Sequence, residues 1–508
     1  MIKSIKYYVV GACLLLTSLS CDPDLLNQTN PNALTPSEFW QTEDDAIKGL
    51  MGAYSPLSIA TYYGRARIWL TDYRDDIVNP FNPSVRTAPA RFVGESTTDT
   101  QRWVYPQVMN VVARSNDVIN FVPGIDMDAS LKETIIGEAH FLRALAYFDL
   151  VMIWRNVPIL RERVTVADQR NQVQADPSDV WDFIIEDFKI AQSKLPTTWD
   201  SSNAGRATSG AATGYLGKAY LFTEQYSLAI AEFNKLSANY DLVANYADNF
   251  SAFTEFNEES IFELSYINDG NGGWGGDQLN RGRALADEPD IAPPGYTSQN
   301  TMRINDWVLP LFLKEQTNGG DIDPRTFTTL FWNHPNSTIY GGVKYEDAFP
   351  GDTRVFGRKW LNIEGGVSNA QFFRNPINRR LMRYSDVLLM LAEAENELNG
   401  PTSIAYDAIN KVRQRVDMPD ITAGLTQSEM RDRIRDERVL ELALEEVRWF
   451  DLIRWGLVKE RVVDLRDANG LDMKSGCGGV GAYVEGREYM DIPQVEIDNA
   501  GFPNNPGY

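Results

Sequence analysis

The chain has 508 residues, 70 of them acidic and 48 basic, which gives a formal net charge of −22. Such an acidic surface repels phosphate backbones and anionic lipids, so it argues against nucleic acid binding and against unaided docking on a membrane. With 43% hydrophobic and 11% aromatic residues, the sequence is typical of a folded globular protein and not of a disordered one.

The first 20 residues are predicted to be a lipoprotein signal peptide (1–20) that is cleaved before Cys21. Lys3 and Lys6 precede an apolar run that ends at Leu19. Because that run is shorter than the about 20 apolar residues that cross a bilayer, it is typical of a removable signal. Acylation of Cys21 would then hold the mature chain on a membrane, since two or three acyl chains bind firmly where one binds only marginally.

Two alternatives to this processing remain open. Cys13 follows a better local acylation pattern, but its use would leave the apolar residues 14–16 in the mature chain. An ordinary secretory signal cut near the same place is the other alternative. After Cys21, residues 21–34 are polar and predict a lipidated tether. Only Cys477 then remains unmodified, so no internal disulfide is expected.

The next segment, 35–265, is predicted to be helical. Apolar residues at helical spacing indicate helices over 35–54, 105–121, 132–154 and 177–195. Residues 213–236 carry the spacing of a tetratricopeptide-like helix pair, in which small Gly217 and Ala229 let two antiparallel helices approach.

The segment 266–380 differs from the rest in composition. Residues 266–366 contain 15 of the 37 glycines, which indicates surface loops with some short strands. Helices are expected to resume at about Leu381 and to run to about residue 464, within a C-terminal part, 381–508. A second, looser helix pair is predicted at 385–416, with a turn at Gly400-Pro401.

Charged residues are dense between 434 and 456. Helical spacing places Glu437 next to Arg433 and Glu445 next to Arg448. Because the same segment also carries an apolar face, its charges must be paired to be tolerated near a core. We expect a structural lattice of ion pairs here, and not a catalytic group.

Several short motifs follow one another along nearly the whole chain. They are FLRALAYFDL (141–150) with VP (157–158), DPR (323–325), RYSDVLL (383–389) with AEA (392–394), AIN (408–410), IRDER (434–438), RWFDLIRWG (448–456) and NPGY (505–508). Together, and in this order, they resemble the SusD/RagB family of outer-membrane lipoproteins.

This resemblance implies a mainly α-helical single domain, built from tetratricopeptide-like helix pairs and a loop-rich region with short strands. It also implies a cell-surface protein, held by its acyl anchor in the outer membrane. The helical side would rest on a SusC-like TonB-dependent transporter, while the loop-rich side binds an oligosaccharide or a peptide, and the pair works as a barrel with a hinged lid. No cofactor is implied, and the sequence leaves calcium binding and the identity of the ligand open.

No catalytic or metal-binding motif is present in the sequence. The two histidines, His140 and His334, are far apart, and His140 is expected to be a packing residue. Sugar rings have apolar C–H faces that suit aromatic side chains, and their hydroxyls need polar partners. Two regions, 69–103 and 274–360, offer this mixture. The predicted ligand-binding residues are Trp69, Asp72, Arg74, Asp75, Trp103, Trp274, Tyr296 and Trp332.

Competing interpretations remain for these residues and for the chain. Most of the aromatic side chains would ordinarily belong to the core, although Trp274, flanked by glycines, is expected to be exposed. Instead of a nutrient receptor, the chain could be a structural or gating subunit of the transporter that never touches the nutrient. A surface hydrolase is the third hypothesis, with no support from the sequence.

Overall fold

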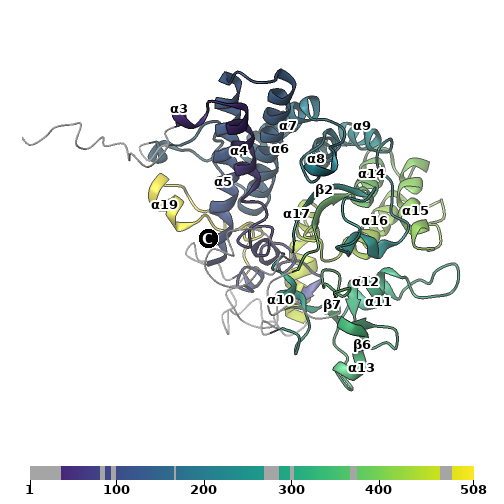
Figure 1. Cartoon of the computed structure of the whole chain (residues 1–508). Coiled ribbons are helices and arrows are strands. Elements are labelled where there is room, and N and C mark those ends of the chain that lie inside the picture. Colours follow the sequence, from purple (N-terminus) through teal and green to yellow (C-terminus); the bar gives the residue numbers. More distant parts are fainter. Residues whose placement is uncertain are drawn as a thin grey trace, which may run out of the picture.

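The computed structural model describes residues 36–79, 86–92, 99–164, 168–267, 285–297, 302–365, 375–468 and 483–508. These residues form a mainly helical structure with a few very short strands (Figure 1), which confirms the predicted fold class. The predictions for Cys21, the signal peptide, the tether and Trp274 lie outside the described residues.

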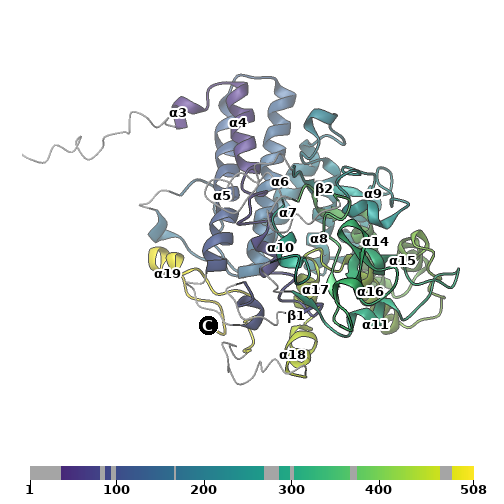
Figure 2. The same ribbon diagram turned by 60° about the horizontal axis from the view of Figure 1, so that its bottom comes forward.

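The N-terminal helices are α3 (Pro36–Phe39), α4 (Glu43–Tyr54), α5 (Asp99–Phe121), α6 (Ala129–Trp154) and α7 (Pro177–Lys194). Helix α6 is buried on all sides over its second half, where most side chains are apolar and the charged Arg143 and Asp149 are paired with Asp187 and Arg67. Figure 2 shows α4, α5 and α6 lying alongside one another. The helices predicted from 105, 132 and 177 are therefore confirmed.

The single helix expected over 35–54 is wrong, because the chain breaks it before Thr42. The Thr42 hydroxyl accepts a hydrogen bond from the Asp45 amide, and the Asp45 carboxylate accepts one from the Thr42 amide. This reciprocal capping starts a new helix at Glu43. Helix α3 is therefore a separate short turn.

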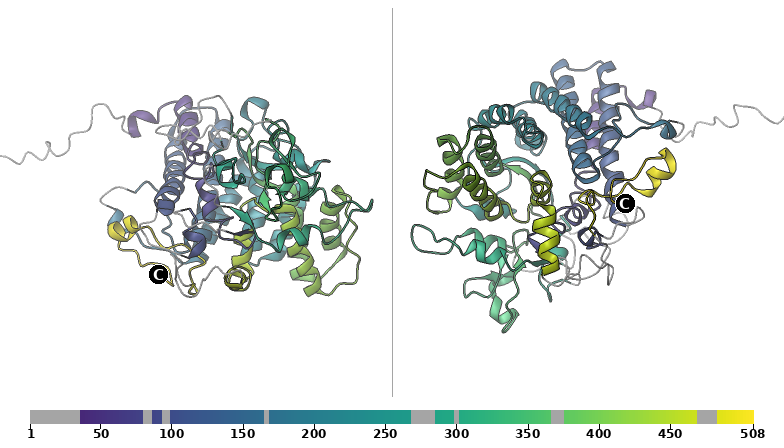
Figure 3. Two further views of the ribbon diagram at one scale, coloured as in Figure 1. Left: turned by 90° about the horizontal axis from the view of Figure 1, so that it is seen from below. Right: turned by 180° about the vertical axis from the view of Figure 1, so that it is seen from behind.

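Both predicted helix pairs are confirmed. The first consists of α8 (Ser209–Phe222) and α9 (Tyr226–Leu236), and the second of α14 (Tyr384–Asn399) and α15 (Ser403–Arg415). A Cβ atom added to Gly217 would lie 2.5 Å from the ring of Phe233, so the first pair needs glycine there. Helices α5 to α9 and then α14 pack neighbour against neighbour, which forms a curved array (Figure 3).

Among the described residues, four antiparallel strand pairs lie in the loop-rich part or join it to its neighbours. They are β1 (Val78–Asn79) with β3 (Arg303–Ile304), β2 (Ser260–Leu264) with β8 (Arg379–Arg383), β4 (Leu330–Phe331) with β7 (Phe356–Gly357), and β5 (Thr338–Ile339) with β6 (Val343–Lys344). The short α-helices between them are α10 (Glu288–Ile291), α11 (Val308–Phe312), α12 (Arg325–Thr329) and α13 (Tyr345–Ala348). Short strands and loops in this region were predicted.

Helices resume with α14 at Tyr384, close to the predicted position of about 381, and Leu381 itself lies in strand β8. Arg379, Arg380 and Arg383 of this strand are all buried, and each pairs with a buried acid. Pairing with β2 therefore holds these residues in an extended conformation, and α14 begins only at Tyr384.

The C-terminal part continues with α16 (Gln427–Leu442), α17 (Arg448–Arg454), a π-helical segment (Lys459–Asp464), α18 (Leu465–Ala468) and α19 (Gln494–Ala500). Leu444 and Glu446 have φ values of 65° and 62°, which lie in the left-handed region and separate α16 from α17. Short 3-10 turns complete the structure at Ala66–Trp69, Pro89–Arg91, Val122–Gly124, Gln169–Asn171, Ser201–Asn203, Tyr246–Phe250 and Tyr340–Gly342. Among the described residues, none of the helices is both long enough and apolar enough to cross a bilayer.

The expected lattice of ion pairs is present, but its predicted pairs are wrong. Glu437 binds Arg325 and Arg413 from other elements, while Arg433 binds Glu315. Since α16 ends at Leu442, Glu445 and Arg448 do not share a helix. Their actual partners are Arg383 and Lys359 for Glu445, and Asp76 for Arg448.

Candidate ligand-binding site

The two regions predicted to bind ligand meet at the short helix α10. Arg65 donates two hydrogen bonds to the Asp290 carboxylate, at 2.6 and 3.0 Å, and Trp69 Nε1 donates to it at 3.4 Å. Two residues earlier, Glu288 accepts a hydrogen bond from the Tyr340 hydroxyl. Helix α10 therefore connects residues near 69 with residues near 340.

Aromatic side chains surround this connection. The rings of Trp69 and Trp103 have centroids 5.7 Å apart, and those of Tyr296 and Tyr340 are 5.5 Å apart. Trp69 and Tyr340 are buried, whereas Trp103 and Tyr296 are only partly covered. Each pair thus places one ring in the core and one ring at the surface.

Arg86 adds a cation to the same place. Its guanidinium group lies over the Trp69 ring at 5.6 Å from the centroid, and its Nε is 3.8 Å from Asp290. We define the candidate ligand-binding site as Arg86, Trp103 and Tyr296 at the surface, over Trp69, Asp290 and Tyr340. It combines aromatic surface with a charged hydrogen-bonding group, as sugar recognition requires.

Burial changes the proton affinity of two groups at this site. It raises the pKa of Glu288 to about 7, although the Tyr340 hydroxyl and the Asn362 amide both donate to the carboxylate. It lowers the pKa of Arg86, and the nearby Asp290 charge opposes this effect. Glu288 therefore gains or loses its proton near neutral pH, next to the tyrosine that supports Tyr296.

The predicted polar residues of the first region point into the protein. Asp72 accepts a hydrogen bond from the Glu446 amide at 2.9 Å, and burial raises the pKa of Asp72 to about 7. Arg74 donates to the Arg487 carbonyl at 2.7 Å, and Asp75 accepts from two following backbone amides. All three are buried, so they have no surface to offer a ligand in this conformation, and their role in binding stays a prediction.

Trp332 is also buried, at 4% exposure, and packs against Phe327 and His334. His140, expected to be a packing residue, is buried and lies 2.6 Å from an Asp187 carboxylate oxygen. In the part of the chain that the structure describes, no cluster of three or more His, Cys, Asp or Glu side chains is suited to hold a metal ion.

Sequence reasoning missed Arg86, Glu288 and Asp290. The two acids have partners far away in the sequence: Asp290 is separated from Trp69 by 221 residues, and Glu288 from Tyr340 by 52. The only local signal is the Glu-Pro-Asp triplet at 288–290, in which a proline at the first turn favours a short helix.

Comparison with known proteins assigns this fold to a family. Residues 258–508 match the model described as "SusD family", and residues 87–221 match the model described as "Starch-binding associating with outer membrane". The chain belongs to the SusD-like family. The resemblance predicted from the sequence motifs is thereby confirmed.

Individual relatives resemble the SusD-like chain over most of its length. SusD-like protein P25 of Formosa agariphila is 27% identical over 91% of this chain and 92% of its own. The crystal structure of a SusD superfamily protein from Bacteroides vulgatus is 25% identical, with a TM-score of 0.82 over 92% of this chain and all of its own. Surface glycan-binding protein A from Bacteroides thetaiotaomicron, solved with laminarihexaose, shares the fold at 22% identity and a TM-score of 0.71, over 91% of this chain and 99% of its own.

Proposed function

We propose that this SusD-like protein is a cell-surface binding protein that captures an oligosaccharide and is not an enzyme. The carrying observation is the candidate ligand-binding site, in which Arg86, Trp103 and Tyr296 reach the surface from segments joined by α10. A partly exposed ring can cover the C–H face of a sugar, and a guanidinium group can donate to its hydroxyls. Proteins that share the fold include a surface glycan-binding protein solved with laminarihexaose. Laminarihexaose is therefore the first ligand to test.

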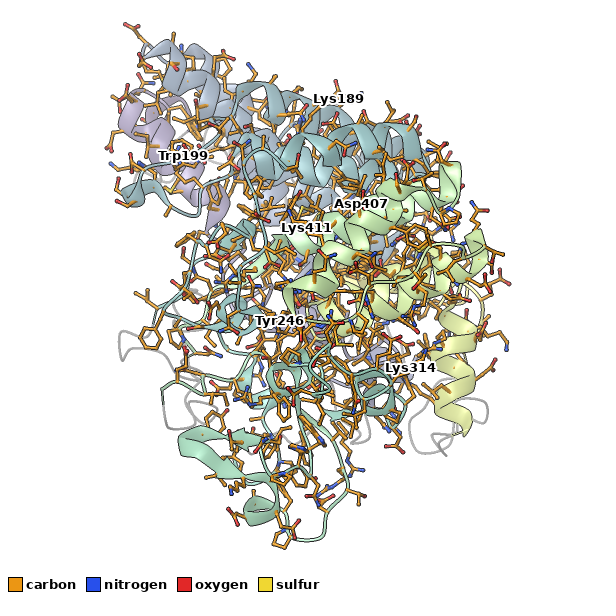
Figure 4. The ribbon with its side chains drawn as sticks, turned by 90° about the vertical axis from the view of Figure 1, so that its right-hand side faces the viewer. Lys189, Trp199, Tyr246, Lys314, Asp407 and Lys411 are labelled. Atoms are coloured by element: carbon orange, nitrogen blue, oxygen red, sulfur yellow. The ribbon has the colours of Figure 1, made fainter. Side chains whose placement is uncertain are left out.

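The proposal extends to location and partner. Acylation of Cys21 would anchor the protein at the outer membrane, facing outward, and the ligand would pass to a SusC-like TonB-dependent transporter that this protein covers as a lid. The curved helical array offers a broad face for such a partner. Figure 4 looks at the side of the molecule that carries α14 and α15, where Lys189 of α7 and Asp407 of α15 are exposed. Capture close to a transporter would raise the local concentration of the ligand.

The test is calorimetric titration of the lipid-free mature protein with laminarihexaose and a panel of neutral oligosaccharides and peptides. We expect saturable binding of at least one oligosaccharide. Trp103→Ala and Arg86→Ala should each weaken that binding about tenfold or more, which corresponds to about 1.4 kcal/mol.

Trp199 provides a matched control. Like Trp103, it is a half-buried tryptophan, and its described contacts are with Arg206, which lies over its ring at 4.0 Å, and with the Ala207 carbonyl, outside the candidate ligand-binding site. Trp199→Ala should leave binding unchanged. If no oligosaccharide binds while the protein still supports transport, the gating-subunit hypothesis replaces the binding-protein hypothesis. Release of shortened sugars from an oligosaccharide would instead favour a hydrolase.

A further inference from the structure

A polar cavity of about 270 Å³ lies between α16, the start of α17, the segment that follows α17, and the residue before α11. Its walls carry the arginines Arg435, Arg448 and Arg461 and the indole of Trp307. No residue of the candidate ligand-binding site lines it. The cavity is therefore a separate place at which a ligand can be held.

The charges in this cavity are arranged by depth. The arginine side chains are the more covered, with 7% of Arg448, 26% of Arg435 and 37% of Arg461 exposed. The carboxylates lie further out, since the Asp432 side chain is 71% and the Asp436 side chain 41% exposed, and Glu460 is also exposed. We call the more exposed acids the rim of the cavity and the more covered arginines its floor.

The three acids that line the cavity match its three arginines in number, but the arginines have more N–H donors than acceptors close enough to bind them. Arg448 and Arg461 share one carboxylate, that of Asp76, at 2.8 and 2.9 Å. Arg435 has its closest acid, Asp432, at 3.6 Å. Nε of Arg435 and Nη1 of Arg448 are buried and lack a hydrogen-bond partner among the described residues. Burial lowers the pKa of Arg435, the direction expected where desolvation outweighs the nearby acids.

We propose that this cavity binds one carboxylate-bearing sugar residue, a uronic acid. The planar carboxylate matches the guanidinium forks of Arg435 and Arg461 at the floor. The sugar hydroxyls are donors, and Asp432, Asp436 and Glu460 at the rim are acceptors for them.

Two further features favour a single sugar residue over a larger or more highly charged ligand. The volume lies just below the about 300 Å³ at which pockets for drug-sized ligands begin. One wall is Trp307, which Arg461 overlies at 4.6 Å and whose Nε1 donates to the Asp76 carbonyl. The acidic rim, on a protein of net charge −22, repels polyanions, so a single carboxylate accompanied by hydroxyls is the best match.

The test is titration of the lipid-free full-length mature protein with sodium glucuronate, with glucose as the neutral counterpart and sodium sulfate as a plain oxyanion. We expect saturable binding of glucuronate, and no binding of glucose or sulfate at the same concentrations. Arg435→Gln should weaken glucuronate binding at least tenfold. Arg461→Gln should do the same, and it leaves Arg448 with its partner Asp76, so it serves if Arg435→Gln fails to fold.

Arg431→Gln is the matched control, because Arg431 lies on the same helix and pairs with Glu397 outside the cavity. It should leave glucuronate binding unchanged. Absence of saturable glucuronate binding, equal binding of glucose or sulfate, or an equal loss in Arg431→Gln would overturn the proposal. Binding of a neutral oligosaccharide should be weakened in Trp103→Ala and unchanged in Arg435→Gln. The proposed function and the uronic acid site are therefore tested independently.

Discussion

The Arg448 side chain donates to the Asp76 carboxylate at 2.8 Å, across 372 residues of sequence. Both side chains are buried, and Arg461 donates to the same carboxylate at 2.9 Å. One acid therefore joins the loop before β1 to the helices at the C-terminal end of the chain.

Replacement of this acid should be costly for stability. Asp76→Asn would leave Arg448 buried without an anionic partner, and the expected loss in free energy of unfolding is about 3–5 kcal/mol. Urea denaturation followed by circular dichroism measures it. The control is Asp464→Asn, which removes an exposed pair with Lys459 and should cost about 1 kcal/mol or less. Equal effects of the two changes would contradict the structural role of Asp76.

Glu288 should give a measurable pH dependence. Its pKa in the folded protein is raised to about 7 from 4.5, so the folded protein binds the proton more tightly than the unfolded chain. The stabilisation from this group is therefore complete below pH 4.5 and declines until about pH 7. Glu288→Gln keeps a hydrogen-bond acceptor for Tyr340 but cannot ionise.

We therefore expect the stability of Glu288→Gln, relative to the parent protein, to increase by about 1–3 kcal/mol between pH 5 and pH 8. Unfolding curves of both proteins at both pH values test this. Taking the difference in free energy of unfolding between the two proteins cancels the contribution of other titrating groups such as Asp72. A constant difference would show that Glu288 titrates normally.

The first tetratricopeptide-like pair should be sensitive to one methyl group. In Gly217→Ala the new Cβ would lie 2.5 Å from the Phe233 ring, and overpacking of this kind costs about 1–3 kcal/mol. Thermal unfolding of the purified variant measures the loss. In the control, Gly52→Ala on α4, nothing lies within 4 Å of the new Cβ, so the better helix propensity of alanine should raise stability by about 0.5–1 kcal/mol.

Membrane attachment should depend on Cys21. Cys21→Ser removes the proposed acylation site, and the protein should move from the outer-membrane fraction to the soluble fraction, since no acyl chain would hold it. Cell fractionation and mass spectrometry of the mature N-terminus check this. Cys13→Ser is the control and should leave attachment intact. The reverse pattern would identify Cys13 as the acylated residue.

Local patterns in the sequence predicted most of the helices and both helix pairs, because spacing within one segment sets which face a helix buries. Gly217 and Phe233, only 16 positions apart, are an example. The predictions failed where a distant partner decides the outcome. Strand β8 was not predicted, because its extended conformation depends on pairing with β2. Glu437 does not pair with Arg433, because Arg325 and Arg413 contact it in the core.

The candidate ligand-binding site shows the same limit. Composition alone indicated the two aromatic regions that contain Trp103 and Tyr296. That α10 unites them depends on Asp290 and Glu288, whose contacts with Trp69 and Tyr340 arise only on folding. Periodicity within a single helix or strand cannot predict a contact between positions 69 and 290.

Glu441 contacts three arginines, Arg325, Arg383 and Arg415, each from a different part of the chain. Arginine keeps its charge at any physiological pH, so loss of this one acid would remove one anionic partner from three buried cations at once and leave them only their other carboxylates, such as Glu437 for Arg325 and Glu259 for Arg383 and Arg415. No second substitution at a single position could repair that damage. We expect these four positions to change during evolution only together, and grafting one of them into a distant relative without the other three should yield protein that does not accumulate in cells.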